Sequence, residues 1–270
     1  GINLFCTVHY TIRSHKIPKE FDGFCIVHLS DLHGALYGEH NRLLVQAIRK
    51  AKPDVVVMTG DMADNSWQSA ALLLELSRRL CSDYMVCYVV GNHEQCMGEA
   101  ALAKLEGKLK ALGATVLENS WCTISRGGAF VKMYGLVTPM VYYKDRLREY
   151  KKGIVFSAKD TRAALGPADP GCFNILLAHN PLYYPSYRQW GADLAFSGHI
   201  HGGVIRIPKF GGLLSPDMTL FPKYDGGCFK EEGKHLVVSR GLGNHFLVRI
   251  MNPPELVVAT LRPTDFAGNC

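Results

Sequence analysis

Five short motifs carry the residues of this chain that are best suited to binding metal ions. In chain order they are Asp31-Leu32-His33, Gly60-Asp61, Gly91-Asn92-His93-Glu94, His179 and Gly198-His199-Ile200-His201. As ligands they supply two carboxylates, one amide and four imidazoles, with one further histidine. Imidazole and carboxylate groups suit Mn, Fe, Zn or Ni, and no thiolate is offered at these positions. The set is large enough for a binuclear metal site, and it leaves one histidine for chemistry.

A binuclear site of this type has a defined chemistry on phosphate esters. Asp61 can serve as the bridge, because one carboxylate can bind two cations at once. Two metal ions about 3.5–4 Å apart can acidify a shared water and clamp a phosphoryl group during in-line displacement. The resulting hydroxide would be a nucleophile near neutral pH. Such a reaction needs no serine or cysteine nucleophile.

Most of these motifs follow an apolar run that is typical of a β-strand. The runs cover residues 24–29, 55–58, 85–90, 173–177 and 194–196. In open α/β sheets, ligands bind outside the carboxyl ends of the strands. We therefore expect the five motifs to converge on one edge of the fold, although they are far apart in the sequence.

The segments between the first strands are typical of helices. Apolar residues fall on one face over residues 41–50, 67–80 and 99–112. A lead-in strand lies within residues 1–23, and short strands are expected at 204–207, 236–239, 246–250 and 256–261. The β-α-β-α-β-α pattern is typical of a sheet covered by helices. We interpret residues 1–270 as one α/β domain with two sheets packed face to face and helices outside.

The motifs resemble those of the calcineurin-like metallophosphoesterase superfamily. Its pattern is D-x-H, G-D-x-x-D, G-N-H-[DE], a lone H and G-H-x-H, and all five parts are present over about residues 24–203. The resemblance implies a four-layer α/β/β/α sandwich of two mixed β-sheets flanked by helices. It also implies two divalent metal ions, whether Mn²⁺, Fe²⁺/Fe³⁺ or Zn²⁺.

The resemblance assigns a role to each motif residue. The implied ligands of the first metal are Asp31, His33, Asp61 and His201, and those of the second are Asp61, Asn92, His179 and His199. His93 would act as a general acid on the leaving oxygen or stabilise charge in the transition state. Asp64 would hold the tautomer of His93; the alternative is that Asp64 caps the helix that begins near Ser66.

Finer features are similar to the YkuE/YaeI-like phosphodiesterase branch. They are residues 18–23, Lys52-Pro53-Asp54, His179-Asn180-Pro181 and Ser239-Arg240-Gly241-Leu242-Gly243. Protein Ser/Thr phosphatases carry Arg-Gly after the position of Asp64, where Asn65 and Ser66 stand here, which argues against that branch. Members of the YkuE/YaeI-like branch often carry an N-terminal anchor or export signal. Relatives cleave membrane-associated phosphate esters such as UDP-acylglucosamine lipids.

We therefore predict a binuclear metal-dependent phosphoesterase that hydrolyses a phosphodiester or pyrophosphate bond by attack of a metal-bridging hydroxide. The substrate itself is not specified by the sequence, and a membrane-associated substrate such as a UDP-sugar lipid is one candidate. The alternatives are a phosphomonoesterase and a metal-binding scaffold with little activity. The intact His93 argues against the scaffold, because degenerate members tend to lose that residue or a ligand.

Composition sets limits on partners and compartment. The 30 basic and 24 acidic residues give a formal net charge of +6, which fits an anionic substrate or membrane surface but is too weak to indicate nucleic acid. No apolar run approaches the ~18 residues that span a bilayer. The chain begins at Gly1, so a removed anchor or signal before residues 1–23 stays open, and with it a peripheral membrane or a cytoplasmic location. Nine scattered cysteines favour a reducing environment, and we expect a monomer.

Several residues outside the ligand set allow two interpretations. Glu94 is either a partner of the metal ligands or a solvated loop acid. His28 is expected in the core and His235 at the surface, whereas His245 could approach the site. The aromatic segment 183–190 either packs in the core or forms a substrate wall. The stretch 208–233 is a lid, a membrane-contacting patch or a loop that packs over the sheet.

Overall fold

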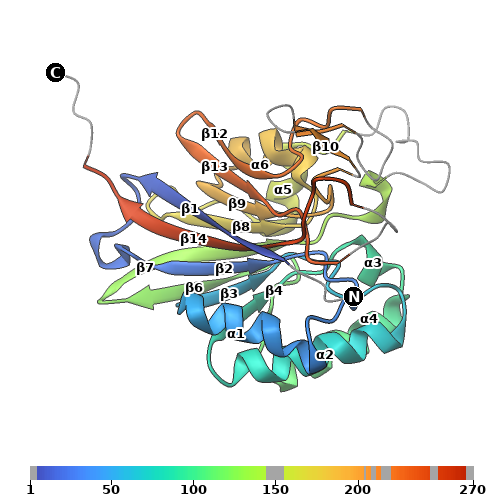
Figure 1. Ribbon diagram of the computed structural model, residues 1–270. Coiled ribbons are helices and arrows are strands. Elements are labelled where there is room, and N and C mark those ends of the chain that lie inside the picture. Colours follow the sequence, from blue (N-terminus) through green and yellow to red (C-terminus); the bar gives the residue numbers. More distant parts are fainter. Residues whose placement is uncertain are drawn as a thin grey trace.

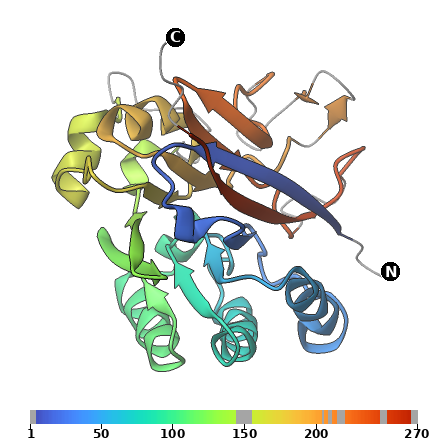
Figure 2. The same ribbon diagram turned by 90° about the vertical axis from the view of Figure 1, so that its left-hand side faces the viewer.

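The computed structural model describes residues 5–143, 155–203, 205–207, 211–213, 220–243 and 249–265. Its strands form two large sheets that pack face to face, as Figures 1 and 2 show. His245 and most of the expected strand at 246–250 lie outside the described residues, as does part of the stretch 208–233.

The first sheet has six strands in the order β1-β14-β2-β3-β4-β5. Their bounds are β1 Cys6–Ser14, β14 Glu255–Pro263, β2 Cys25–Leu29, β3 Val55–Met58, β4 Met85–Tyr88 and β5 Thr115–Val116. The strands β2 to β5 are parallel, and β14 runs antiparallel to β2. The four residues of β3 are all buried, as expected for a strand covered on both faces.

The second sheet also has six strands, in the order β12-β13-β9-β8-β7-β6. Their bounds are β6 Ser120–Arg126, β7 Ala129–Leu136, β8 Asn174–Ala178, β9 Leu194–Ser197, β12 Gly227–Glu231 and β13 Lys234–Val238. The four inner strands are parallel, and the two outer ones are antiparallel to their neighbours. A small separate pair joins β10 (Arg206–Ile207) to β11 (Gly211–Gly212).

Helices cover the outer face of each sheet. On the first sheet lie α1 (Arg42–Ala51), α2 (Trp67–Cys81) and α4 (Glu99–Ala111); on the second lie α5 (Ala158–Leu165) and α6 (Tyr184–Trp190). Short helical turns are α3 (Asn92–Gln95), η1 (Lys19–Phe21), η2 (Glu39–Asn41), η3 (Met140–Tyr142) and η4 (Pro181–Tyr183). The predicted helices 41–50, 67–80 and 99–112 are thus confirmed as α1, α2 and α4.

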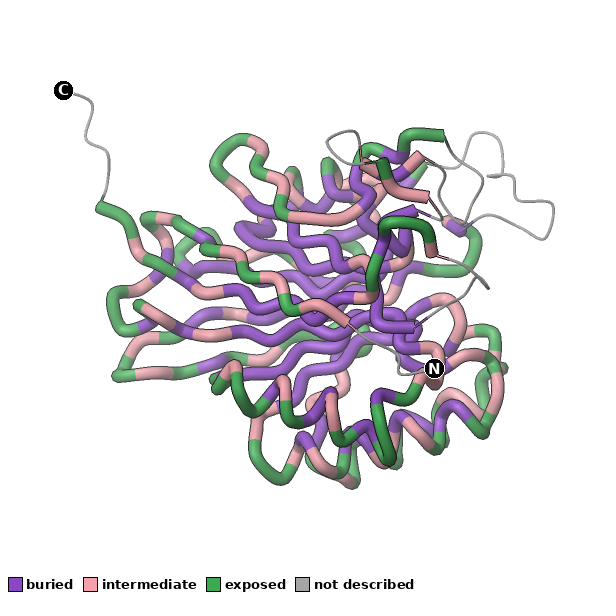
Figure 3. The backbone as a smooth tube through the Cα atoms, viewed as in Figure 1, coloured by how far each residue is buried: buried purple, intermediate pink, exposed green. Residues whose placement is uncertain are grey.

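The core consists of three apolar clusters that separate four layers. One lies between α1, α2, α4 and the first sheet, the second between the two sheets, and the third between the second sheet and the helices α5 and α6. Figure 3 shows the inner strands of both sheets as a buried region in the middle of the molecule. The predicted α/β/β/α sandwich is confirmed. That residues 1–270 form a single domain stays a prediction. Among the described residues, no helix combines the length and apolar character needed to cross a bilayer.

Candidate metal centre

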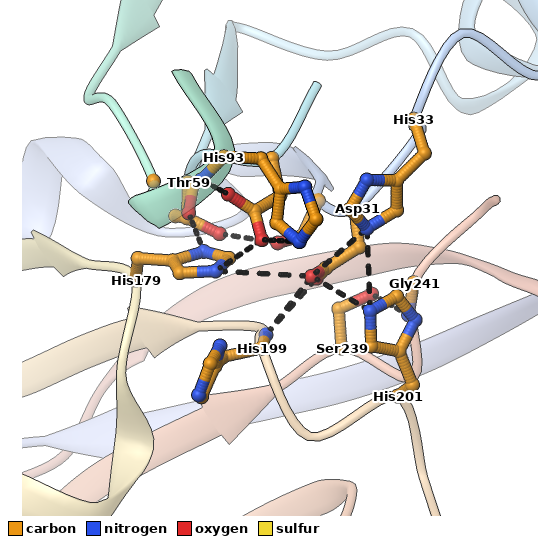
Figure 4. Close-up of polar contacts among 12 residues, drawn as sticks. Asp31, His33, Thr59, His93, His179, His199, His201, Ser239 and Gly241 are labelled. Carbon is orange, nitrogen blue, oxygen red and sulfur yellow. Dashed lines mark hydrogen bonds and ion pairs between the residues drawn. The ribbon is translucent and has the colours of Figure 1, made fainter. Parts of the chain in front are cut away.

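The ligand-bearing motifs meet at one edge of the two sheets. Asp31, Asp61 and Asn92 follow β2, β3 and β4 of the first sheet, whereas His179 and His199 follow β8 and β9 of the second. Parallel strands end at the same edge, and the face-to-face packing brings the two edges together. Figure 4 shows the side chains of Asp31, His33, His179 and His201 close together, each from a different element or motif. The expected convergence is therefore present.

The first group of donors is built around Asp31. Asp31 Oδ1 lies 3.3 Å from His201 Nε2 and 4.0 Å from His33 Nε2. The two histidine rings are stacked, and their Nε2 atoms are 3.3 Å apart. Donor atoms of all three residues lie within 4.8 Å of one another, a separation that one cation can span.

The second group is built around Asp61. His179 Nε2 lies 3.0 Å from Asp61 Oδ2 and 3.9 Å from Asp31 Oδ1. Donor atoms of Asp61, His179 and His199 lie within 4.8 Å of one another, and Asp61 forms a further such group with His33 and His93. Asp61 thus lies between two sets of histidines, where the predicted bridging carboxylate belongs.

The donor set fits divalent metals on observations of this structure. His179 Nδ1 lies 2.7 Å from the carbonyl oxygen of Thr59, so the ring presents Nε2 to the carboxylates. Such a contact is typical of metal-binding histidines, because it fixes the tautomer. Asn92 Oδ1 is buried and, among the described residues, has no hydrogen-bond partner. An amide oxygen left without a donor at this edge can serve as a metal ligand.

Electrostatics at the site also favour a cation. Burial lowers the pKa of His179, but the carboxylates of Asp61 and Asp31 outweigh it and raise the pKa to about 10. Burial raises the pKa of Asp61, but His179, His93 and His33 outweigh it and hold the pKa well below its usual range. The two buried carboxylates therefore attract positive charge, which a metal would supply on releasing the histidine proton.

The backbone of several predicted ligand residues is held in an unusual conformation. Asp31, His33, Asp61, His199 and His201 all have positive φ, between 48° and 67°. This left-handed region is sparsely populated by residues other than glycine, and such strain gathers at functional sites. The conformation turns the chain sharply after each strand and directs the side chain back toward the centre.

Backbone N–H groups orient the two carboxylates. His199 N donates to both oxygens of Asp31 at 3.1 Å, and His93 N donates to Asp61 Oδ1 at 2.8 Å. The two carboxylates can come this close to the backbone only because glycines stand there. A Cβ on Gly198 would lie 2.1 Å from Asp31 Oδ2, and one on Gly91 would lie 2.1 Å from Asp61 Oδ1. The glycines of the third and fifth motifs are thus explained by lack of space.

His93 lies beside the metal-binding groups and is partly open to solvent. Its side chain is 26% exposed, its Nε2 lies 3.9 Å from Asp61 Oδ2, and its ring packs edge-on against that of His33. The side chains of Asp31, Asp61 and His179 are at most 2% exposed. The imidazole of His93 is therefore more open to solvent than these three side chains, and a substrate can reach it from outside.

Asp64 is bonded to the start of α2. Its Oδ1 accepts hydrogen bonds from Ser66 N at 2.7 Å and from Ser69 Oγ at 2.5 Å. Ser66 is the N-cap residue of α2, and its side chain accepts from Ser69 N. The residue that caps α2 is therefore Ser66, so the alternative that Asp64 is itself the cap is wrong, and Asp64 instead accepts hydrogen bonds from this cap residue and from the first turn. Its role in orienting His93 stays a prediction.

Three residues outside the predicted ligand set, Glu94, His235 and His28, are buried. Glu94 is fully buried and accepts hydrogen bonds from Gly91 N, Asp61 N and Ala63 N at 2.9, 2.9 and 3.0 Å. The solvated-acid alternative is therefore wrong. His235 is 5% exposed, so its predicted surface position is wrong as well: it lies on β13, an inner strand of the second sheet, paired with Lys230 of β12 and Leu194 of β9. His28 is buried against Thr59 Oγ1 at 2.7 Å, as predicted.

Some residues near the centre were not singled out from the sequence. The guanidinium of Arg249 lies 3.2 Å from His201 Nδ1, and the ring of Tyr143 packs edge-on against that of His199. Neither belongs to a motif, so no sequence signal marked them. The Ser239–Gly243 stretch did carry a signal: Gly243 N donates to Asp31 O at 2.6 Å, and a Cβ on Gly241 would stand 2.8 Å from that of Asp31.

Comparison with known proteins decides the family. A family model described as calcineurin-like phosphoesterase matches residues 25–203. The chain belongs to this family. The predicted superfamily is thus confirmed, and with it the expectation that the chain is a metal-dependent phosphohydrolase.

Curated relatives confirm the predicted branch. The chain is 30% identical over 265 residues to the uncharacterized metallophosphoesterase YkuE of Bacillus subtilis, over 96% of this chain and 86% of YkuE. It is 26% identical to the phosphodiesterase YaeI of Escherichia coli, over 88% of this chain and 82% of YaeI. It is also 26% identical to the UDP-2,3-diacylglucosamine pyrophosphatase LpxG of Chlamydia trachomatis, over 89% of this chain and 85% of LpxG.

Proposed function

We propose that this calcineurin-like phosphoesterase holds two divalent metal ions and hydrolyses a phosphodiester or pyrophosphate bond. The observation that carries the proposal is the position of Asp61, which belongs to donor groups on both sides of the centre. A single metal site would need only one such group. The metal could be manganese, iron or zinc, since imidazole and carboxylate suit all three.

Each ligand has a place in this scheme. Asp31, His33 and His201 would hold the first metal with Asp61, and His179, His199 and Asn92 would hold the second with Asp61. When bound, the metal pair supplies an acidified water as nucleophile and neutralises charge on the phosphoryl group. The chain itself fixes the donors in place through the strained turns and the N–H groups that hold Asp31 and Asp61.

His93 is the proton donor in this proposal. Its partial exposure places the imidazole on the side from which a phosphate ester can approach. Its backbone N–H bonds Asp61, so the ring position is tied to the bridging carboxylate. A protonated imidazole there can deliver a proton to the leaving oxygen, which matters most when the leaving group is a poor one.

Relatives favour a diester or pyrophosphate over a monoester. YaeI is named a phosphodiesterase, and LpxG is named a pyrophosphatase of a diacylated UDP-sugar. Both names describe a phosphorus atom that is linked on two sides. The LpxG likeness also favours a lipid-linked substrate. The alternatives are a phosphomonoesterase and a metal-binding scaffold with little activity.

Turnover of bis-p-nitrophenyl phosphate with Mn²⁺, compared with p-nitrophenyl phosphate, tests the proposal. We expect the diester to be the better substrate and the purified protein to carry two metal ions by elemental analysis. Asp61→Asn should lose metal as well as turnover, whereas Asp22→Asn, at an exposed ion pair with Arg262, should lose neither. An Asp61→Asn protein with full metal content and full turnover would show that the proposal is wrong.

A further inference from the structure

Five large apolar side chains are exposed together beside the metal centre. They are Ile207, Leu220, Phe221, Ile250 and Met251, with exposed fractions of 38%, 64%, 62%, 47% and 64%. We call these five residues the apolar rim. Backbone hydrogen bonds join the segments that carry these residues. Arg206 N donates directly to Ile250 O, and Leu213 links the other two segments, because Leu213 N donates to Ile205 O and Phe221 N donates to Leu213 O. The rim is thus one surface and not five scattered positions.

A cavity of about 650 Å³ opens within this surface. Rim residues Ile207, Phe221 and Met251 line it together with the basic residues Arg206 and Lys223. The Lys223 side chain is 68% exposed and paired with Glu231 at 3.1 Å, and Arg206 is paired with Asp225 at 2.8 Å. Apolar side chains that project beside basic side chains are typical of protein surfaces that bind to a lipid bilayer.

The apolar rim is connected directly to the metal centre. Asn252 follows Met251 in the chain, and its side chain donates to the carbonyl oxygens of His201 and Gly203, both at 2.6 Å. His201 is a proposed ligand of the first metal. In Figure 1, β10 lies at the side of the molecule where β2 ends. A surface that rests on the rim would therefore lie next to the place where phosphate esters are cleaved.

The geometry points to an anionic lipid surface as the occupant of the apolar rim. At roughly 200 Å² for each side chain, the exposed fractions of the five residues offer about 550 Å² in total. A stable protein interface needs about 800 Å² from each partner, so the rim is too small to hold a second copy alone. Projecting apolar side chains can enter the headgroup region of a bilayer, and the formal net charge of +6 favours anionic lipids.

Docking on lipid would also define the substrate class. Phosphate esters of lipid headgroups would then face the metal centre from the membrane surface. This second step rests on the proposed function, whereas binding of the rim to lipid does not. The two can therefore fail separately.

Two exposed residues of the apolar rim, Phe221 and Met251, can be replaced without straining the backbone. Phe221 and Met251 have φ of 49° and 53°, a region that asparagine enters more readily than other residues. The double variant Phe221→Asn, Met251→Asn removes apolar surface and keeps the backbone compatible. Phe130→Thr is the matched control, because Phe130 is 47% exposed on β7, in the β6–β7 hairpin at the far side of Figure 1 from β10.

Co-sedimentation with vesicles tests the proposal. The probes are vesicles of phosphatidylcholine alone and of equal parts phosphatidylcholine and phosphatidylglycerol. We expect the wild type and Phe130→Thr to bind the anionic vesicles, and the double variant to bind at least tenfold more weakly. Hydrolysis of bis-p-nitrophenyl phosphate should be the same in all three proteins, which also shows that the variants are folded.

Absence of vesicle binding by the wild type, or equal binding by the double variant, would overturn the proposal. A wild-type dimer that the double variant converts to a monomer, without any vesicle binding, would assign the rim to a second copy instead. Wild-type protein that binds anionic vesicles but hydrolyses no phosphate ester would support lipid docking while the proposed function fails.

Discussion

Glu94→Gln tests how the second and third motifs are held together. The Glu94 carboxylate accepts one bond from the N–H of Asp61, one from Gly91 and one from Ala63. It therefore fixes the backbone of Asp61, the proposed bridging ligand, relative to the loop that carries Asn92. No other described side chain accepts a hydrogen bond from more than one of these three N–H groups.

The cost of the substitution follows from these contacts. Glutamine has one carbonyl oxygen, which can keep the bonds from Asp61 and Gly91, while its NH₂ group would face the N–H of Ala63. A buried N–H without an acceptor costs about 1–3 kcal/mol, and the two remaining bonds lose their charge assistance. Removal of a buried charge beside Asp61 offsets part of this. We expect the free energy of unfolding to fall by about 2 kcal/mol.

Metal affinity is the more specific measurement. Loss of a group that orients a ligand typically weakens metal binding by about 10- to 100-fold. Competition with a chelating dye measures the affinity, and urea unfolding of the metal-free protein measures stability. Glu106→Gln is the matched control, since Glu106 is 6% exposed on α4 and outside the motifs. Wild-type metal affinity in Glu94→Gln would refute the reasoning.

Three further predictions address the proton donor, the turn glycines and a core histidine. His93→Ala should keep both metals by elemental analysis but lower kcat by about 10²–10⁴-fold, and the loss should be largest for substrates with poor leaving groups. Equal losses of kcat for good and poor leaving groups would contradict the general-acid role. Gly198→Ala should displace the carboxylate of Asp31 and lower the metal content that remains after dialysis. The control is Gly107→Ala, because a Cβ at Gly107 meets nothing within 4 Å; this variant should be more stable in urea unfolding by about 0.5–1 kcal/mol. Burial lowers the pKa of His28 to about 3, so between pH 6.5 and 3 the unfolded chain binds more protons and stability falls as pH falls. His28→Gln should remove about 2 kcal/mol of the stability lost between pH 6.5 and 5, and an unchanged pH profile would show that His28 is not buried in its neutral form.

The central strands and the site could be predicted because their signals are local. Val55–Met58 is a short apolar run followed by Gly60 and Asp61, and it became a strand buried on both faces. The metal-binding residue types stand at the ends of such runs, so strand order was not needed to expect their convergence. Helices α1, α2 and α4 were predictable from their apolar faces in the same way.

The edge of the second sheet was not predicted, because its signal is weak. Strand β6, Ser120–Arg126, is an edge strand in which only one residue is buried, so polar and apolar residues do not alternate clearly. Helix α5, Ala158–Leu165, buries only two of its eight residues. Glu94 and His235 show a different limit. Their burial depends on loops and strands that close over them, which no local pattern records.

The centre combines several features that each work against folding. Asp31, Asp61 and Glu94 are buried carboxylates, and the described positive charges nearest to them are histidines and Arg249. Burial of a carboxylate is costly unless it is paired, and positive φ at a residue other than glycine costs about 1–3 kcal/mol. These costs gather at the carboxyl ends of strands whose other residues fill three apolar clusters. The core therefore holds these strained turns in place, and a bound cation would offset the cost of burying their carboxylates.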